Sequence, residues 1–149
     1  MNLLLNYLTK MKIFTKNFLL FIASAFAIIT ISRMLLSYFL SQQNFNGAWL
    51  TALVWGISLF ISGRYFGKKD VEYLPLYQSG YRFHLATYLI FACVSFVWFK
   101  MEMNSLYEYI SQLYQTLFWW GIFLIFHTIL FATSLNKSIK GLEKSEIFE

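Results

Sequence analysis

The sequence predicts an all-α membrane protein whose four transmembrane helices form two tandem helical hairpins, and three observations lead to this fold class. Of 149 residues, 58% are hydrophobic and only 13% are charged, whereas about a quarter of the residues in soluble domains are charged. Residues 117–131 are apolar on every side of a helix and contain one ionisable group, a histidine, a composition that suits lipid or a protein interior. The pattern Trp-Gly-Ile-x-Leu begins at Trp55 and again at Trp120, so the hairpins are expected to be a parallel repeat.

Four apolar stretches follow one another with short connections, and each is close to the roughly 20 residues that a helix needs to cross a bilayer. The first, at 18–40, is longer than the apolar region of a signal peptide, so it is expected to be a membrane helix. The expected segments are a first transmembrane hairpin with a basic N-terminal segment at 1–66, a cytoplasmic connection at 67–82, a second hairpin at 83–136 and a cytoplasmic tail at 137–149.

Lysine and arginine lie mostly on one side of the membrane in this predicted topology. The opposite side receives only Lys100 and Arg33 of the twelve basic residues. By the positive-inside rule, both termini are expected in the cytoplasm, with the chain in a bacterial cytoplasmic (inner) membrane. The net charge of +5 then reflects the cytoplasmic segments, so the lipid bilayer is the expected partner and no nucleic acid is. The basic residues on the side of the termini are Lys10, Lys12, Lys16, Arg64, Lys68, Lys69, Arg82, Lys137, Lys140 and Lys144.

Two motifs in the second half resemble the bacterial 2TM domain family. They are Gly80-Tyr81-Arg82-Phe83-His84-Leu85-x-x-Tyr88 and Trp120-Gly121-Ile122-x-Leu124-x-x-His127. The resemblance covers about residues 78–133, and a divergent copy would occupy the first half. It implies a helical hairpin of a kind found alone or joined to signalling and DNA-binding domains. The family has no established activity, so the resemblance implies a fold and leaves the function open.

Small residues form a stripe on one face of the second predicted helix. Steps of four and seven residues return to nearly the same face of a helix, and small side chains let membrane helices approach closely. The stripe therefore predicts a contact with another helix, either in the same chain or in another subunit. Its members are Ala48, Ala52, Gly56, Gly63 and Gly67.

Three polar residues within the spans are candidates for a functional role: Arg33, His84 and His127. Arg33 is expected to reach the outer interface, to pair with Glu102, or to line an ion or substrate path. At about 1.5 Å of rise per residue, His127 is expected about 10 Å deeper than His84, which argues against shared haem ligation. Each histidine is expected to hydrogen-bond a neighbouring helix or headgroup, with a pH-responsive or gating role as the alternative.

The sequence lacks the sets of residues that several kinds of chemistry require. Cys93 is the only cysteine, which excludes an intrachain disulfide or a paired-thiol redox site. Neither a zinc ligand set nor a nucleophile with its base and acid is recognisable, nor is a glycine-rich phosphate loop. No enzyme, cofactor or metal is therefore expected. A proton-coupled transporter is also disfavoured, because no carboxylate lies within a predicted span.

Two functional hypotheses remain. The first is a non-enzymatic four-helix membrane module that oligomerises and anchors or signals for a cytoplasmic protein partner. The alternative is a small oligomeric ion channel or membrane-permeabilising effector of a stress or phage-defence system. Exposure of Arg33 to lipid would cost about 2.5–3.5 kcal/mol, which favours a homo-oligomer with Arg33 at a subunit interface or around an axial opening. Under the channel hypothesis, Arg33 would line the outer mouth of the pore and favour anions.

Overall fold

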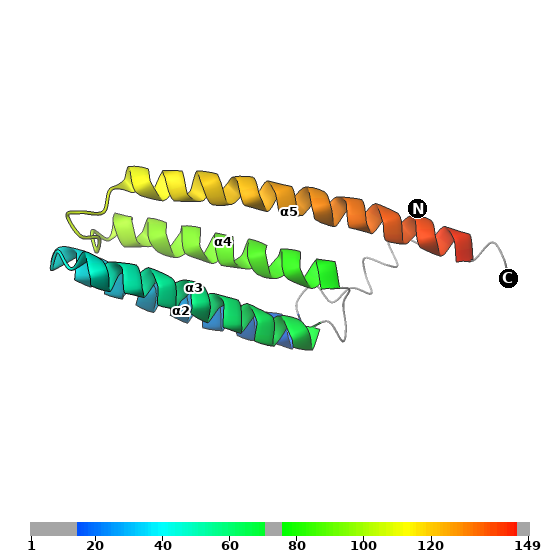
Figure 1. The fold of residues 1–149 in the computed structure, drawn as a ribbon, viewed down its shortest axis with the longest axis horizontal. Coiled ribbons are helices and arrows are strands. Elements are labelled where there is room, and N and C mark those ends of the chain that lie inside the picture. Colours follow the sequence, from blue (N-terminus) through cyan, green and yellow to red (C-terminus); the bar gives the residue numbers. More distant parts are fainter. Residues whose placement is uncertain (1–14, 71–75, 146–149) are drawn as a thin grey trace.

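The computed structural model describes residues 15–70 and 76–145, and side chains within 15–70 and 80–133. Over these residues the chain is helical with no strand, and it contains four helices (Figure 1). Each helix holds a segment long and apolar enough to cross a membrane, which confirms an all-α, multi-pass membrane protein. The helices are α2 (Lys16–Ser41), α3 (Phe45–Asp70), α4 (Leu76–Lys100) and α5 (Ile110–Ser145).

The helices extend further than the hydropathy pattern predicted. Helix α3 continues to Asp70 and α4 begins at Leu76, so most of the predicted connection at 67–82 is helical. Helix α5 continues to Ser145 and takes in most of the predicted tail. The predicted basic N-terminal segment lies largely outside the described residues, as does the end of the tail.

The helices pack in the order α3, α2, α4, α5. Helix α2 lies against both α3 and α4, α3 touches α4 over a shorter stretch, and the described backbone of α5 lies beside α4 alone. Figure 1 shows two antiparallel hairpins, with α5 continuing beyond the ends of α3 and α4. The end where α2 turns into α3 and α4 passes into α5 is called the turn end here, and the opposite end is called the terminal end.

Side chains of α2 and α4 make most of the core. Residues on one face of α2 recur every three or four positions, as expected of a helix that buries one stripe. One cluster lies towards the terminal end and the other towards the turn end, where Leu113 of α5 joins it. The clusters are Phe18, Phe21, Ala25, Phe83 and Ala86, and Ile29, Phe91, Val94 and Leu113.

Residues at equivalent positions of the sequence repeat meet in the structure. The ring centroids of Phe18 and Phe83 are 5.4 Å apart, and those of Trp55 and Trp120 are 6.3 Å apart. Both pairs have the same separation in the sequence (83 − 18 = 120 − 55). Contact between equivalent positions is expected close to a two-fold axis, which here would run between α2 and α4.

Helices α2 and α4 end in the same way. Gln43 and Glu102 adopt positive φ angles of 54° and 55°. The next amides, those of Asn44 and Met103, donate to carbonyls five residues earlier at 2.9 and 3.1 Å. This pattern closes helix ends with a left-handed residue, a position that glycine favours because it has no Cβ.

Glu102→Gly should therefore raise the free energy of unfolding by about 0.5–1 kcal/mol, because the left-handed cost of about 1–2 kcal/mol exceeds the extra entropy that glycine loses, about 0.5–1 kcal/mol. Gln43→Gly should gain less, since it also removes the bond from Gln43 Nε2 to the Tyr107 hydroxyl at 2.7 Å. Unfolding in mixed detergent micelles measures both variants. Glu102→Ala is the control, and an equal gain from it would refute the explanation.

Candidate functional site

Arg33 forms a buried ion pair at the turn end. Its Nη1 lies 2.9 Å from Glu108 Oε1, and the two side chains are 11% and 5% exposed. The partner predicted from the sequence, Glu102, is exposed, and Arg33 pairs with Glu108 instead. The difference arises because the segment between α4 and α5 folds back over the helix ends and carries Glu108 inwards, whereas Glu102 occupies the outward left-handed position.

Glu108 connects several parts of the turn end. Its Oε2 accepts hydrogen bonds from the Ser37 hydroxyl at 2.6 Å and from the Ser105 amide at 2.8 Å. The Trp98 indole donates to the same Ser37 hydroxyl at 2.9 Å. One carboxylate thus connects α2, α4 and the segment before α5, and it neutralises Arg33. Glu108 was not singled out from the sequence, and this role was missed.

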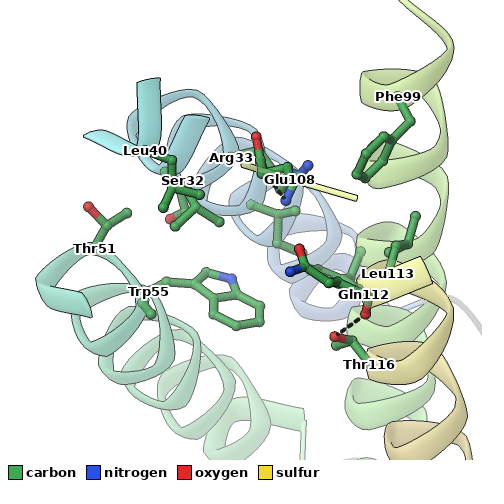
Figure 2. A pocket seen from close by; sticks show the side chains of 14 residues that line it. Ser32, Arg33, Leu40, Thr51, Trp55, Phe99, Glu108, Gln112, Leu113 and Thr116 are labelled. Carbon is green, nitrogen blue, oxygen red and sulfur yellow. Dashed lines mark hydrogen bonds and ion pairs between the residues drawn. The ribbon is translucent and has the colours of Figure 1, made fainter. Parts of the chain in front are cut away.

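A cavity of about 270 Å³ lies beside this ion pair, among all four helices (Figure 2). Figure 2 shows Trp55 of α3 facing the Arg33–Glu108 pair, with Phe99 of α4 on the far side. Arg33 Nε and Nη2 and Trp55 Nε1 are buried with no hydrogen-bond partner among the described residues. The guanidinium also lies 5.6 Å from the Phe99 ring centroid. Since Glu108 balances the charge of Arg33, this region has a fixed dipole and no net charge.

A second buried carboxylate lies at the terminal end. Asp70, the last residue of α3, is fully buried and accepts a hydrogen bond from the Thr15 hydroxyl. Thr15 also caps α2, where it accepts from the Phe18 amide at 3.1 Å. Arg82 Nη1 lies 3.9 Å from Asp70 Oδ2, and its guanidinium lies over the Phe18 ring. Asp70 therefore joins the ends of α2, α3 and α4, and its burial explains why α3 extends past the predicted boundary.

His84 and His127 stack on each other, with ring centroids 4.9 Å apart and planes 17° apart. The predicted difference in depth between them, about 10 Å from the helical rise per residue, is wrong. His84 lies sixteen residues before the end of α4 at Lys100 (100 − 84), and His127 lies seventeen after the start of α5 at Ile110 (127 − 110). The two positions are therefore level when counted from the turn end, whereas the prediction counted from the terminal end, where α5 extends beyond α4 (Figure 1).

The hydrogen bond from Trp120 determines the protonation state of His84 in this arrangement. Its indole Nε1 lies 3.1 Å from His84 Nε2. Because an indole nitrogen only donates, His84 Nε2 accepts and the imidazole is neutral. The described residues hold no group of three His, Cys, Asp or Glu side chains placed to bind a metal. The histidine pair is thus a packed, hydrogen-bonded contact between α4 and α5.

Three aromatic rings fill the middle of the space between α3 and α5. Trp55, Phe91 and Trp120 have ring centroids separated by 5.6 Å (Trp55–Phe91), 5.3 Å (Phe91–Trp120) and 6.3 Å (Trp55–Trp120). A second cavity, a groove of about 720 Å³, begins at Trp55 and Trp120 and runs towards the terminal end. The aromatic cluster therefore separates this groove from the cavity beside Arg33.

The predicted small-residue stripe lines these two cavities over most of its length. Ala48 is buried, and a Cβ on Gly63 would lie 3.8 Å from the Phe21 ring. A Cβ on Gly56 would meet nothing within 4 Å, so Gly56 makes no close helix contact within the chain. Contact with another subunit stays a prediction. The residues that line a cavity are Ala52, Gly56, Gly63 and Gly67.

Together, the fold and these contacts define a polytopic helical membrane protein with one buried, ion-paired carboxylate at each end, Glu108 at the turn end and Asp70 at the terminal end. Comparisons with protein-family models, curated proteins and solved structures give no match for the chain. Membership of the 2TM domain family therefore stays a prediction based on the two motifs.

Proposed function

We propose that the protein is a non-enzymatic four-helix membrane module that pairs with a second copy of itself through α5 and anchors or signals for a cytoplasmic protein partner. The distribution of lysine and arginine supports an orientation with the terminal end facing the cytoplasm. Lys16, Arg64, Lys68 and Lys69 are the exposed cations described at that end. A bacterial cytoplasmic membrane is part of the same proposal.

Helix α5 is the observation that carries this proposal. Within Ile110–Thr133, Leu113 is the only buried residue. The helix is 36 residues long, about 54 Å at 1.5 Å per residue, whereas the hydrocarbon core is about 30 Å thick. Figure 1 shows α5 continuing beyond the ends of α3 and α4, so this one continuous helix would connect the membrane to the aqueous phase. Such a helix is suited to transmitting a change in membrane packing to a partner outside the bilayer.

One face of α5 has the character of a helix–helix contact. Gln115, Trp119, Ile122 and Phe126 follow one another at steps of three or four residues, and all are exposed. Gln115 makes no hydrogen bond with a described residue, and a polar group left in lipid without a partner is unfavourable. A two-fold dimer would place each Gln115 beside its equivalent. Interhelical hydrogen bonds in membranes average about 0.6 kcal/mol, and packing of the neighbouring aromatic rings would add to this.

The ion pair of Arg33 changes the balance between the two functional hypotheses. An unpaired arginine favoured both an oligomer and an anion-selective pore, but Glu108 neutralises Arg33 inside one chain. Arg33 therefore no longer supports an anion-attracting mouth. The case for assembly rests on α5 instead, and it does not require a conduction path.

Disulfide cross-linking in membranes tests the α5 contact. In a Cys93→Ser background, Ile122→Cys should form a covalent dimer on mild oxidation, because the equivalent positions of two α5 helices would face each other. Ile57→Cys is the matched control, since Ile57 occupies the equivalent position of the repeat on α3 (122 − 57 = 120 − 55) and is also exposed. Equal cross-linking at both positions, or none at Ile122, would contradict an α5 interface.

A further inference from the structure

The groove between α3 and α4 has the dimensions of one leaflet of a bilayer. It runs along α3 from Trp55 to Lys68, with Trp120 closing its deep end. The thirteen steps between these two residues (68 − 55) span about 20 Å at 1.5 Å of rise each. Half of a hydrocarbon core is about 15 Å. The groove therefore extends from near mid-bilayer to the headgroup region.

The walls of the groove are mostly apolar and partly without side chains. His84 also lines the groove, and its Nε2 accepts a hydrogen bond from Trp120 Nε1 at 3.1 Å. Glycine residues of α3 and α4 line it, and a Cβ on Gly56 or Gly80 would meet nothing within 4 Å. Leu59 and Phe83 supply apolar surface. The hydroxyl of Thr87 donates to the Phe83 carbonyl of its own helix at 2.8 Å, so the donor of this polar residue is already satisfied. The interior matches an alkyl chain better than a polar molecule.

The rim of the groove at the terminal end is positively charged. Arg64 and Lys68 line it and are exposed, and neither makes an ion pair or hydrogen bond with a described residue. No acidic side chain lines the groove within the described part of the chain. The adjacent carboxylate of Asp70 is buried and is engaged by Thr15 and Arg82. Among the described residues, the two cations of the rim thus have no counter-charge, which suits an external anion.

We propose that this groove binds one anionic phospholipid, with an acyl chain along the glycine wall and the phosphate between Arg64 and Lys68. Basic pockets between membrane helices suit anionic headgroups, because Coulomb attraction acts where the interface is only partly hydrated. The groove of a second copy would bring the same two cations against this rim, so charge favours a lipid over a copy of the chain. The proposal does not depend on pairing through α5.

Native mass spectrometry of the full chain, released from nanodiscs of mixed phosphatidylglycerol and phosphatidylcholine, tests the proposal. The wild type should retain one phosphatidylglycerol in preference to phosphatidylcholine. The double variant Arg64→Gln with Lys68→Gln should weaken retention by about 30-fold, because it removes two cations that attract the anionic headgroup. The control, Lys16→Gln with Lys69→Gln, removes the same charge from exposed positions that do not line the groove and should retain the lipid.

Gly56→Leu tests the acyl-chain half of the proposal separately. Its side chain enters open space, so the fold should tolerate it while the retained lipid is lost. Equal retention of the two lipids by the wild type would overturn the proposal. So would a loss as large in the control as in the Arg64 and Lys68 variant, or unchanged retention in Gly56→Leu.

Discussion

Glu108→Ala should lower the free energy of unfolding by about 3–5 kcal/mol, the cost of leaving a buried charge without its partner. The variant would leave Arg33 without its counter-charge, and the Ser37 hydroxyl and Ser105 amide would lose their common acceptor. Unfolding in mixed detergent micelles, followed by circular dichroism, measures the change. It should be the largest effect of any single substitution of an acidic residue in the described chain.

Two controls separate the ion pair from a general effect of charge. Glu102→Gln, at the exposed position that the sequence suggested as the partner, should change stability by less than about 0.5 kcal/mol. Arg33→Leu combined with Glu108→Leu should recover much of the loss, because replacing both members of a buried pair by apolar residues is often neutral. If Glu108→Ala were as stable as Glu102→Gln, the buried pair would not contribute as described.

Asp70→Ala should be the second most damaging change, with a loss of about 3 kcal/mol, at the lower end for a broken buried pair. The lower value is expected because Arg82 lies 3.9 Å from the carboxylate and is partly exposed. The variant also removes the acceptor of the Thr15 hydroxyl, which caps α2. The same unfolding measurement applies.

Substitutions of Thr15 test the connection between Asp70 and the start of α2. Thr15→Ser keeps the hydroxyl and should remain close to the wild type. Thr15→Val removes both the bond to Asp70 and the cap, and loss of such a cap costs about 1 kcal/mol. In the Asp70→Ala background the additional loss from Thr15→Val should be smaller, since one of the two bonds is already gone. Fully additive losses would show that the two residues act independently.

The fold class was predictable because membrane helices are determined by the summed hydropathy of about twenty residues. That sum locates the spans and the hairpins, although it does not locate the helix ends. A pattern of hydropathy cannot show that Asp70 is buried by Thr15 and Arg82, so the prediction ended α3 four residues early (70 − 66). The error in the relative depth of His84 and His127 arose because α5 extends beyond α4 at the terminal end (Figure 1), so residues counted from the terminal ends of the two spans are not at the same level.

The polar contacts depended on tertiary structure that no local pattern specifies. The sequence showed that Arg33 needs a partner. It did not show which one, because Glu102 and Glu108 are both acidic residues of the same connection. The choice between them follows from backbone geometry: Glu102 has a φ of 55° and its side chain is exposed. Glu108 comes after the segment has folded back over Ser37. The cost of leaving Arg33 unpaired showed that a partner was needed, and only the path of the chain showed which one.

The mass of the protein in lipid nanodiscs tests the central claim, that this chain works as a self-assembling membrane module, most directly. One chain has a mass of 17.7 kDa. We expect a protein mass of twice that value or a higher multiple, reduced towards one chain when Trp119 and Phe126 on the α5 face are both replaced by alanine. A wild-type mass equal to that of a single chain, across the protein-to-lipid ratios at which the fold is intact, would contradict the proposed assembly.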